Sequence, residues 1–503
     1  MNHNWLKSAL ARSILVAAAV YMLSAACLCA GENFLLTPKA VASDRFRLEV
    51  DGQSVFVQKF KDIHYAHFPY PGPGAALVEV SARRAFDTLE LSPKSAGIQT
   101  RLDPDSLALS FKLQKAGNWV ITMDDREHLF IFAEAPSEEP AKAVSVLDYG
   151  ADASGKADST KAIQKAIDAV PAGTTVRIPA GHFISGSLFI RSGITLFLEA
   201  GALLQASGNP GDFEPEQNAF IVIENAENAA LKGRGTIDGS GAYLRHLTDV
   251  SGRLLAVRDS HDVEVEGVIL RNSRAWNTHI IRSENVTLRN VKILNDRLVL
   301  NTDGINPDSS RHVLIKDTFF YCGDDAVAIK STNRGGRFED VYDITVRNNI
   351  VLTKKSALKV GTETHAAEMR DIHFLNNDVI ESDRGMALYA RDGTHMHGIR
   401  FVGNRFERPY PEYQQRLIDF RMTERHGLSR ISDVLIKDNV VDGTWRQASL
   451  IKGISAEHGI SNVVFDNLTI AGKTCRSADD IPLEAGPHVR GISFKVSAEN
   501  AAQ

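Results

Sequence analysis

A strand-like segment recurs every 23 to 35 residues through the second half of the chain, and this repeat limits the fold more than any other feature. Eight segments begin with an apolar residue at an equivalent position, namely Val263, Val286, Val313, Ile344, Ile372, Ile399, Val434 and Val463. Repeats of this length stack into one continuous core, because a single unit cannot bury its apolar face alone.

Among repeat folds, these units favour a parallel β-helix. Propeller blades need longer units with four strands, and the leucine spacing of leucine-rich repeats is absent. Asn or Asp follows most of the segments, and such residues suit corners because they tolerate left-handed backbone and form local hydrogen bonds. We therefore expect a structural role for these corner residues, which are Asn290, Asp317, Asn348, Asn377, Asn404, Asn439 and Asn467.

The sequence before the repeats has a different pattern. Alternating apolar and polar residues between positions 32 and 136, broken by Gly, Pro and Asp, indicate antiparallel strands of a small β-sandwich, with Trp119 in its core. The stretch "EAPSEEPAKA" (134–143) has the composition of a linker, and 158–170 has the apolar spacing of a capping helix. We predict an all-β chain: signal peptide 1–30, β-sandwich 31–138 and parallel β-helix 143–497.

The N-terminal segment and the charge suggest where the protein works. Basic residues precede an apolar run from Ile14 to about Ala30, as in a secretory signal; a membrane anchor and a lipoprotein modified at Cys27 are the alternatives. We expect a secreted or periplasmic monomer without a membrane span in the mature chain. The net charge of −5 on 503 residues argues against a nucleic-acid partner. Only Cys322 and Cys475 lie beyond the signal, and their pairing is left open.

Three aspartates interrupt the repeat. Asp303 in "NTDGINPDSS" and Asp324 in "YCGDDAVAIKS" are 21 residues apart, about one coil, and Asp325 follows directly. Adjacent parallel strands are about 4.8 Å apart, so these carboxylates should be near neighbours. Asp325 has the parity of the inward-facing Val327, and we expect Gly323 to let the chain bend so that Asp325 reaches solvent.

Clustered carboxylates repel one another, and this cost is typical of acid–base chemistry in which one pKa is raised. Inverting hydrolysis of a glycosidic bond uses one carboxylic acid and one carboxylate, held roughly 6.5–9.5 Å apart so that water fits between them. Neighbouring coils of a β-helix can supply that gap. A calcium site at coil corners is the structural alternative.

The motifs "NTDGINP" and "CGDDAVAIKS" together resemble the paired signature of glycoside hydrolase family 28, the polygalacturonases and their relatives. The resemblance extends over about 144–496, and it implies a right-handed β-helix that hydrolyses with inversion. By matching position, Asp324 would be the general acid, and Asp303 with Asp325 would hold the attacking water. Substrate-binding roles would fall to three further residues, Asn301, Trp276 and His279.

The sequence departs from this family at its carboxylate clamp. Ser356 stands at the expected His, and Ala387 and Tyr389 replace the Arg and Lys that grip a galacturonate. Either the cleaved sugar is not a plain galacturonate, or other cations replace the clamp. We include Tyr389 and the nearby cations as candidate substrate-binding residues: Lys359, Arg384 and Arg391.

No cofactor or metal is predicted, since His365, His395 and His397 lack convincing ligand spacing. The favoured function is an exported inverting hydrolase of α-glycosidic bonds in a pectic or related acidic polysaccharide. The sandwich also resembles the dextranase-like family 49, so a neutral α-glycan hydrolase is one alternative. A polysaccharide lyase and a non-catalytic glycan-binding β-helix are the others.

Overall fold

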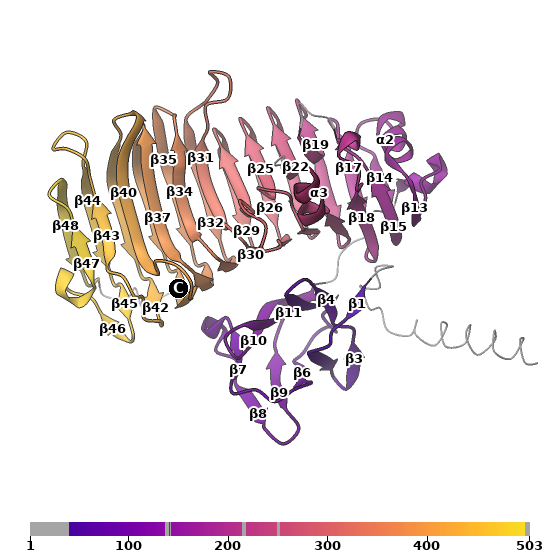
Figure 1. Ribbon diagram of the computed structural model, residues 1–503, viewed down its shortest axis with the longest axis horizontal. Helices are drawn as coiled ribbons and strands as arrows, with labels where there is room; N and C mark the ends of the chain where they lie inside the picture. Colours follow the sequence, from indigo (N-terminus) through magenta and orange to yellow (C-terminus); the bar gives the residue numbers. More distant parts are fainter. Residues whose placement is uncertain (1–39, 136–139, 141, 214–217, 249–251, 498–503) are drawn as a thin grey trace, which may run out of the picture.

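The computed structural model describes residues 40–135, 140, 142–213, 218–248 and 252–497. A small β-sandwich lies alongside a long stack of coils (Figure 1). The stack is a parallel β-helix, as the repeat predicted, and it is right-handed, as the resemblance implied. The predicted signal segment, residues 1–30, lies outside the described residues.

Two antiparallel-rich sheets form the sandwich. The six-stranded sheet has the order β1 (Val41–Ala42), β4 (Gln58–Phe60), β5 (Ile63–Pro69), β11 (Glu127–Glu134), β10 (Gly117–Met123) and β7 (Leu89–Ser92). The five-stranded sheet has the order β3 (Gln53–Val55), β2 (Phe46–Val50), β6 (Ala76–Ala82), β9 (Ala108–Leu113) and β8 (Thr100–Asp103). Trp119 is buried in the core between them, as expected.

Three parallel sheets form the β-helix. The first sheet runs β12 (Ala143–Ser145), β14 (Thr175–Ile178), β17 (Thr195–Leu198), β20 (Ala230–Gly233), β23 (His261–Glu266), β26 (Glu284–Arg289), β29 (Arg311–Lys316), β32 (Val341–Arg347), β35 (Glu368–Leu375), β38 (His395–Val402), β41 (Arg430–Lys437), β44 (Ile460–Asp466) and β48 (Val489–Lys495). The second sheet runs β13 (Ser154–Asp158), β15 (Gly181–Ser185), β18 (Ala202–Ala206), β21 (Thr236–Asp238), β24 (Ile269–Arg271), β27 (Lys292–Leu294), β30 (Phe319–Cys322), β33 (Ile350–Thr353), β36 (Asp378–Ser382), β39 (Arg405–Pro409), β42 (Val440–Val441), β45 (Thr469–Ile470) and β46 (Lys473–Thr474), the last pair being antiparallel. The third sheet runs β16 (Leu188–Phe189), β19 (Ala219–Glu224), β22 (Arg253–Arg258), β25 (Thr278–Ile281), β28 (Ile305–Asp308), β31 (Val327–Ser331), β34 (Ser356–Thr364), β37 (Arg384–Asp392), β40 (Arg416–Gly427), β43 (Ser449–Lys452) and β47 (Leu483–Ala485).

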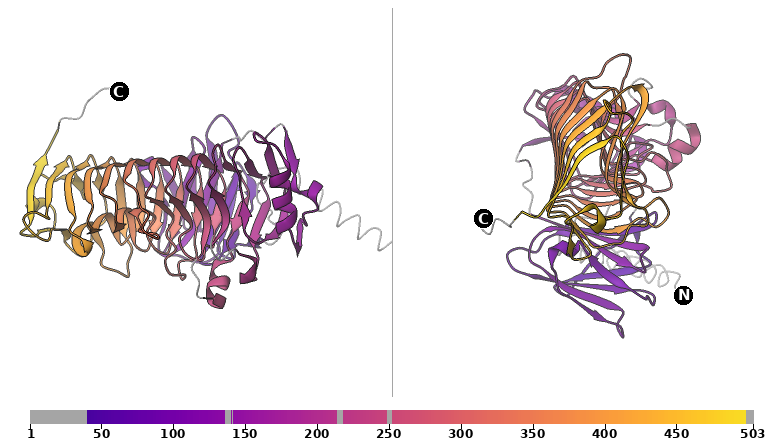
Figure 2. Two further views of the ribbon diagram at one scale, coloured as in Figure 1. Left: turned by 90° about the horizontal axis from the view of Figure 1, so that it is seen from above. Right: turned by 90° about the vertical axis from the view of Figure 1, so that its left-hand side faces the viewer.

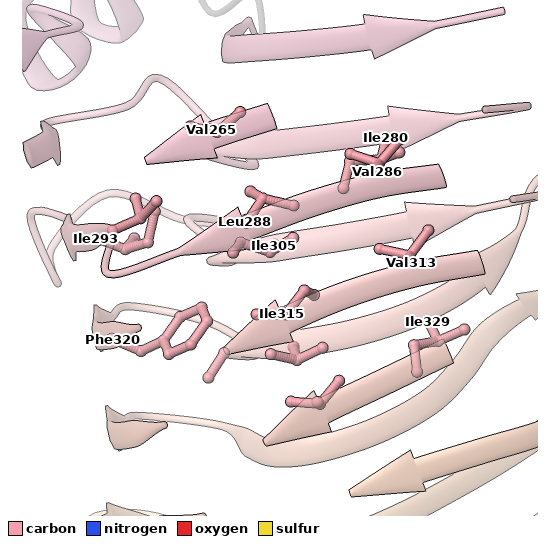
Figure 3. Packing of buried hydrophobic residues seen from close by; sticks show 14 of the residues in the cluster. Val265, Ile280, Val286, Leu288, Ile293, Ile305, Val313, Ile315, Phe320 and Ile329 are labelled. Carbon is pink, nitrogen blue, oxygen red and sulfur yellow. The ribbon is translucent and has the colours of Figure 1, made fainter. Parts of the chain in front are cut away.

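The eight apolar positions identified in the sequence pair directly in the first sheet. Each of the seven predicted neighbour pairs, from Val263 with Val286 to Val434 with Val463, is observed in register. Their side chains stack along the interior with those of the other two sheets, as Figure 3 shows for Val286, Val313 and Ile305. Continuous burial of this kind is the main stabilising contribution, because each coil covers the apolar face of the next.

The corner residues fall into two structural classes. Asn290, Asp317, Asn348 and Asn467 adopt left-handed backbone with φ of 53–56°, which Asn and Asp tolerate better than most residues. Three others, Asn377, Asn404 and Asn439, are fully buried and form a ladder that begins one residue beyond Asn348, at Asn349. Both classes are structural, as predicted.

Helical segments are few in the described chain. Helix α2 (Thr160–Ala169) closes the first coil by burying Ile163, Ala166 and Ile167, which confirms the predicted capping helix. The others are α3 (Gly241–Thr248), η1 (Lys94–Ala96), η2 (Val146–Tyr149), η3 (Pro210–Asp212) and η4 (Ala478–Asp480). None in the described residues is long and apolar enough to span a bilayer. Cys322 and Cys475 are buried and not bonded to each other.

The sandwich packs on the outer face of the second sheet. Phe130 and Phe132 of β11 contact Phe319 of β30, with ring centroids 4.7 and 5.0 Å apart. Arg271 of β24 links the two bodies: its Nε donates to Asp238 Oδ2 at 2.7 Å and its Nη1 donates to the Tyr65 hydroxyl at 2.9 Å. The view along the stack in Figure 2 places the sandwich on one side of the coils. The outer face of the third sheet is therefore not covered by the sandwich.

Candidate active site

The outer face of the third sheet carries the polar residues of the two motifs. Ile305 of β28 and Val327 and Ile329 of β31 point into the core. Because side chains alternate along a strand, the intervening residues point outward. These outward residues include Asn306 and Lys330, which are buried polar side chains.

The strand register sets how the three aspartates meet. Ile305 pairs with Val327, and Gly304 N–H donates to Asp325 C=O at 2.9 Å. Continued two residues back, this register places Asp303 beside Asp325, whereas the 21-residue spacing had suggested Asp324. Asp324 stands one residue earlier in the turn, and its Oδ1 accepts from Asp325 N–H at 2.9 Å.

Gly323 precedes Asp324 and Asp325, where the sequence suggested that glycine is needed for a bend. The structure gives a different reason. The φ of Gly323 is not positive, so a left-handed bend is not what requires glycine. A Cβ here would lie 2.5 Å from Thr302 Oγ1 and 3.1 Å from Arg297 Cα. Close packing of two successive turns therefore excludes any side chain at this position.

Asp325 is the carboxylate with the most donors. Lys359 Nζ donates to its Oδ2 at 2.6 Å and Ser356 N–H donates to its Oδ1 at 2.9 Å, while Arg384 Nη2 lies 4.0 Å from Oδ1. Burial alone would raise the pKa of Asp325, but the charges of Lys359 and Arg384 hold it well below its usual range. Asp325 is thus held as the ionised carboxylate.

Asp303 has a different environment. Lys330 Nζ lies 3.7 Å from its Oδ2, and this ammonium also donates to Glu363 Oε2 at 3.1 Å. In the amide orientation that satisfies its hydrogen bonds, the Asn306 side-chain nitrogen donates to Asp303 Oδ2 at 3.0 Å and to Ala328 C=O at 3.3 Å. Burial raises the pKa of Asp303 well above its usual range despite Lys330, and the neighbouring carboxylates add to the effect.

Asp324 is the most accessible of the three carboxylates, being only half-buried. Burial, and then the adjacent Asp325 charge, raise its pKa, while Lys359 opposes the rise. The cluster therefore holds two carboxyl groups, Asp303 and Asp324, that retain their protons more readily than usual beside one, Asp325, that is firmly ionised. A general acid and a general base need that difference.

Trp276 and His279 lie next to the cluster. Lys330 Nζ and Arg253 Cζ both lie over the Trp276 ring, each 4.3 Å from the ring centroid. His279 contacts this ring edge-on at 5.1 Å, and its Nε2 lies 2.9 Å from Asp308 Oδ2. Burial lowers the pKa of His279 to about 4, so the imidazole is neutral near pH 7.

The position of the missing clamp is occupied by a new set of polar residues. Ala387 pairs with Lys359 on one neighbouring strand and with Asp419 on the other. The Tyr389 hydroxyl donates to Asp419 Oδ2 at 2.5 Å, and Arg421 also binds this carboxylate, at 2.7 and 2.5 Å. Lys359 is therefore one coil away from the lost Arg, and its charge is engaged by Asp325.

The remaining predicted residues are less closely tied to the cluster. Arg384 Nε donates to Ser356 Oγ at 2.8 Å, and its Nη1 lies 3.3 Å from Asp383. Arg391 lies on the same face as Tyr389, and its buried Nε has no hydrogen-bond partner among the described residues. Asn301 is exposed with φ of 59°, and within the described chain no hydrogen bond joins it to the three carboxylates.

Three site residues were not identified from the sequence: Lys330, Asn306 and Glu363. Lys330 and Asn306 both lie within the quoted motifs, at outward positions. Counting every second residue from Ala326 leads to Lys330, and counting from Gly304 leads to Asn306. Glu363 lies within the irregular end of β34, where the pairing with β31 shifts register, so no simple pattern marks it.

Two groups of side chains in the described chain have metal-ligand geometry. They are His365 with Asp392 and His426, and Glu368 with His395 and His397, with ligand atoms within 4.8 Å of one another. Arg425 already binds the Asp392 carboxylate at 2.6 Å. Neither group includes one of the three aspartates.

Comparison with known proteins shows which family this part of the chain is similar to. The family model for glycosyl hydrolases family 28 matches residues 170–402, which include the three aspartates. Over this stretch the chain is similar to members of glycoside hydrolase family 28. Its right-handed β-helix agrees with an exopolygalacturonase structure from Yersinia enterocolitica, at 18% identity and a TM-score of 0.58, covering 92% of this chain and 95% of the other.

Individual sequence relatives agree with the family match. A "Probable polygalacturonase" from Vitis vinifera is 31% identical over 38% of this chain and 45% of its own length. An "Endo-polygalacturonase" from Pectobacterium parmentieri is 30% identical over 42% of this chain and 60% of its own length. The matches thus span about half the length of these curated relatives.

Proposed function

We propose that this protein is an inverting glycoside hydrolase that cleaves α-glycosidic bonds in a pectic or related acidic polysaccharide. The observation that carries the proposal is the cluster of three carboxyl groups on an uncovered sheet face, in which Lys359 binds Asp325 while Asp324 stays accessible. Asp324 has a raised pKa and Asp325 a lowered one. Names of the polygalacturonase relatives support the substrate class.

Each carboxylate has a role that its surroundings favour. Asp324, which is accessible and protonated more readily than usual, donates a proton to the leaving glycosidic oxygen. Asp325, held ionised by Lys359, accepts a proton from the attacking water. Asp303 helps to hold that water, and its own position is fixed by Asn306 and Lys330.

Substrate contacts follow the outer face of the third sheet. We assign the sugar-facing surface to Trp276 and His279 on one side of the aspartates and to Tyr389, Arg384 and Lys359 on the other. Arg391 and Asn301 would contact substrate at the edges of this face. The aromatic ring of Trp276 offers an apolar surface to a sugar ring.

Replacing Asp324 by Asn tests the assignment. The amide keeps the shape but cannot donate an acidic proton, so kcat should fall by about 10²–10⁴-fold. Binding of an oligosaccharide, followed by titration calorimetry, should persist, and the thermal midpoint should remain close to that of the wild type. Unchanged turnover in this variant would refute the role of Asp324.

A hydrolase of neutral α-glycans is the second candidate, and the loss of the clamp favours it. Ala387 offers no charge to a carboxylate, and the cations nearby are already bound by Asp325 and Asp419. Hydrolysis of a neutral α-glucan, with no activity on any uronate polymer, would decide for this candidate.

The remaining assignments complete the proposal. The N-terminal residues 1–30 would direct export to the periplasm or beyond the cell, after which residues 31–138 and 143–497 act as sandwich and catalytic β-helix in a monomer. Signal cleavage can be read from the N-terminal sequence of the exported protein, and the monomer from its sedimentation.

A further inference from the structure

A pocket of about 380 Å³ lies on the same sheet face, on the N-terminal side of the aspartates. Five arginines line it, together with His279, Ile281, Asn218 and Glu224. The arginines come from β22, from the end of β25 and from the loop after β31, and they are Arg253, Arg258, Arg282, Arg334 and Arg337.

Among the described residues that line the pocket, guanidinium groups outnumber carboxylates. Asp259 binds Arg282 at 2.8 and 2.6 Å and Arg337 at 3.0 Å, and Glu224 lies 3.9 Å from Arg258. Asp308 lies behind His279, which it binds. No carboxylate in the described chain lies within ion-pair distance of Arg253 or Arg334.

Arg253 illustrates the charge balance of the pocket. Burial is the main factor that lowers the pKa of the Arg253 guanidinium to about 10; repulsion by the positive charge of Arg334 adds to this effect, and the negative charges of Asp303 and Asp308 oppose it. Its Nε is buried and has no hydrogen-bond partner in the part of the chain that the structure describes. Its guanidinium instead stacks on Trp276, 4.3 Å from the ring centroid. An anion in the pocket would relieve this repulsion and could accept from Arg253.

The cations beside the aspartates differ in this respect. Lys359 is bound by Asp325, Lys330 by Glu363 and Asp303, and Arg421 by Asp419. Each of these charges is already compensated by a carboxylate of the protein. Among the described residues, the pocket brings together five arginines, of which Arg253 and Arg334 have no carboxylate within ion-pair distance.

The pocket and the aspartates are close enough to contact one chain of sugars. Strand β22 is followed in the third sheet by β25 and then β28, which leads from Asp303. Two strand spacings are about 10 Å. Trp276 bridges the gap, since it contacts Arg253 of the pocket and Lys330 of the cluster.

We propose that this arginine pocket is a binding subsite for an anionic substituent of the glycan, a carboxylate or a sulfate ester, located away from the bond that is cleaved. The inference rests on the proposed function for its substrate class. Under this proposal, acidic sugars are recognised by the arginine pocket on one side of the aspartates, and not by a clamp at Ala387 on the other side. Arginine suits this task because its planar fork matches carboxylate and sulfate oxygens.

Binding to an inactive protein tests the proposal without requiring turnover. In an Asp324→Asn background, Arg334→Gln and Arg253→Gln would each be compared with Arg101→Gln, an exposed arginine on β8 of the sandwich. Calorimetry would use an oligogalacturonate, its fully methyl-esterified counterpart and a sulfated oligosaccharide of similar length. Arg334 is exposed in a loop, so its substitution should leave folding intact.

We expect each pocket substitution to weaken oligogalacturonate binding about fivefold, with no change for the neutral ester or for Arg101→Gln. Weakening confined to the sulfated ligand would support the pocket and identify sulfate as the anion. Equal affinities in all variants, or equal losses for acidic and neutral ligands, would overturn the inference.

Failure of the proposed function would give a different result. If the wild-type protein hydrolyses none of these glycans, but acidic ligands still bind in a pocket-dependent way, the hydrolase proposal fails and the subsite remains. If hydrolysis occurs while the pocket variants bind normally, the subsite fails and the hydrolase proposal remains.

Discussion

Buried charged residues occur on two faces of the β-helix. The two faces differ in how completely cations and hydrogen-bond donors compensate the buried carboxylates. On the second sheet, under the sandwich, Asp238 accepts from Arg271, Asn272 and the Ser240 N–H, so its charge is matched. On the third sheet, three carboxylates share a small region and the pKa of Asp303 is raised well above its usual range. Matched charges join two bodies, whereas mismatched charges cost stability and are typical of a working site.

Asp303→Asn should separate activity from stability most strongly. We expect kcat to fall by about 10²–10⁴-fold, because the attacking water loses a carboxylate. The raised pKa means that the folded chain binds the Asp303 proton more tightly than the unfolded chain. That contribution to stability is present at low pH and is lost as pH rises through the folded-state pKa.

An amide at position 303 stays neutral at every pH, so the variant should be at least as stable as the wild type at pH 7. Urea unfolding at pH 7 measures this, with the exposed Asp105→Asn as control. A clear loss of stability in Asp303→Asn would show that this carboxylate is structural.

Arg271→Met should have the opposite effect, lowering stability while leaving turnover unchanged. It leaves Asp238 buried without its cation, which should reduce the free energy of unfolding by about 3–5 kcal/mol. Turnover of the protein that remains folded should be unchanged, because the sandwich packs away from the third sheet. Adding Asp238→Asn should recover part of the loss, since the unpaired charge is then removed; no recovery would mean that the packing of Arg271, and not its charge, is what matters.

Of these three substitutions, Lys359→Met should produce the smallest effect, a shift in the pH dependence of kcat/KM. Without the ammonium, the pKa of Asp325 should rise toward its usual range, because Lys359 is the main charge that lowers it. The base works only when ionised, so the acidic limb of the kcat/KM profile should move to higher pH. The exposed Lys112→Met in the sandwich is the matched control. An unmoved acidic limb would exclude Asp325 as the titrating base.

The core of the fold was predictable, and the charge pairing was not. Positions such as Val263 and Val286 repeat because every coil must cover the last, so spacing alone gave their register. The turns do not repeat so regularly. The step from Asp303 to its neighbour is one residue longer than the motif spacing suggested, which makes Asp325 its partner.

Which side chains meet across coils depends on the number of residues between equivalent positions in adjacent coils. Lys330 was overlooked because its place beside Asp303 follows only when the register and the outward parity are both known. Gly323 was assigned to a bend, whereas its position is set by the close approach of Thr302. Local sequence predicts strands, but contacts between loops of different coils require the three-dimensional arrangement.

The most direct test of the account is the configuration of the first product. Wild-type protein would be incubated with pectic, rhamnogalacturonan, algal and α-glucan substrates, and the new reducing end followed by proton NMR. We predict cleavage of an acidic α-linked glycan with the β-anomer appearing before mutarotation. Initial release of the α-anomer, an unsaturated product, or cleavage that persists after Asp324→Asn would contradict it.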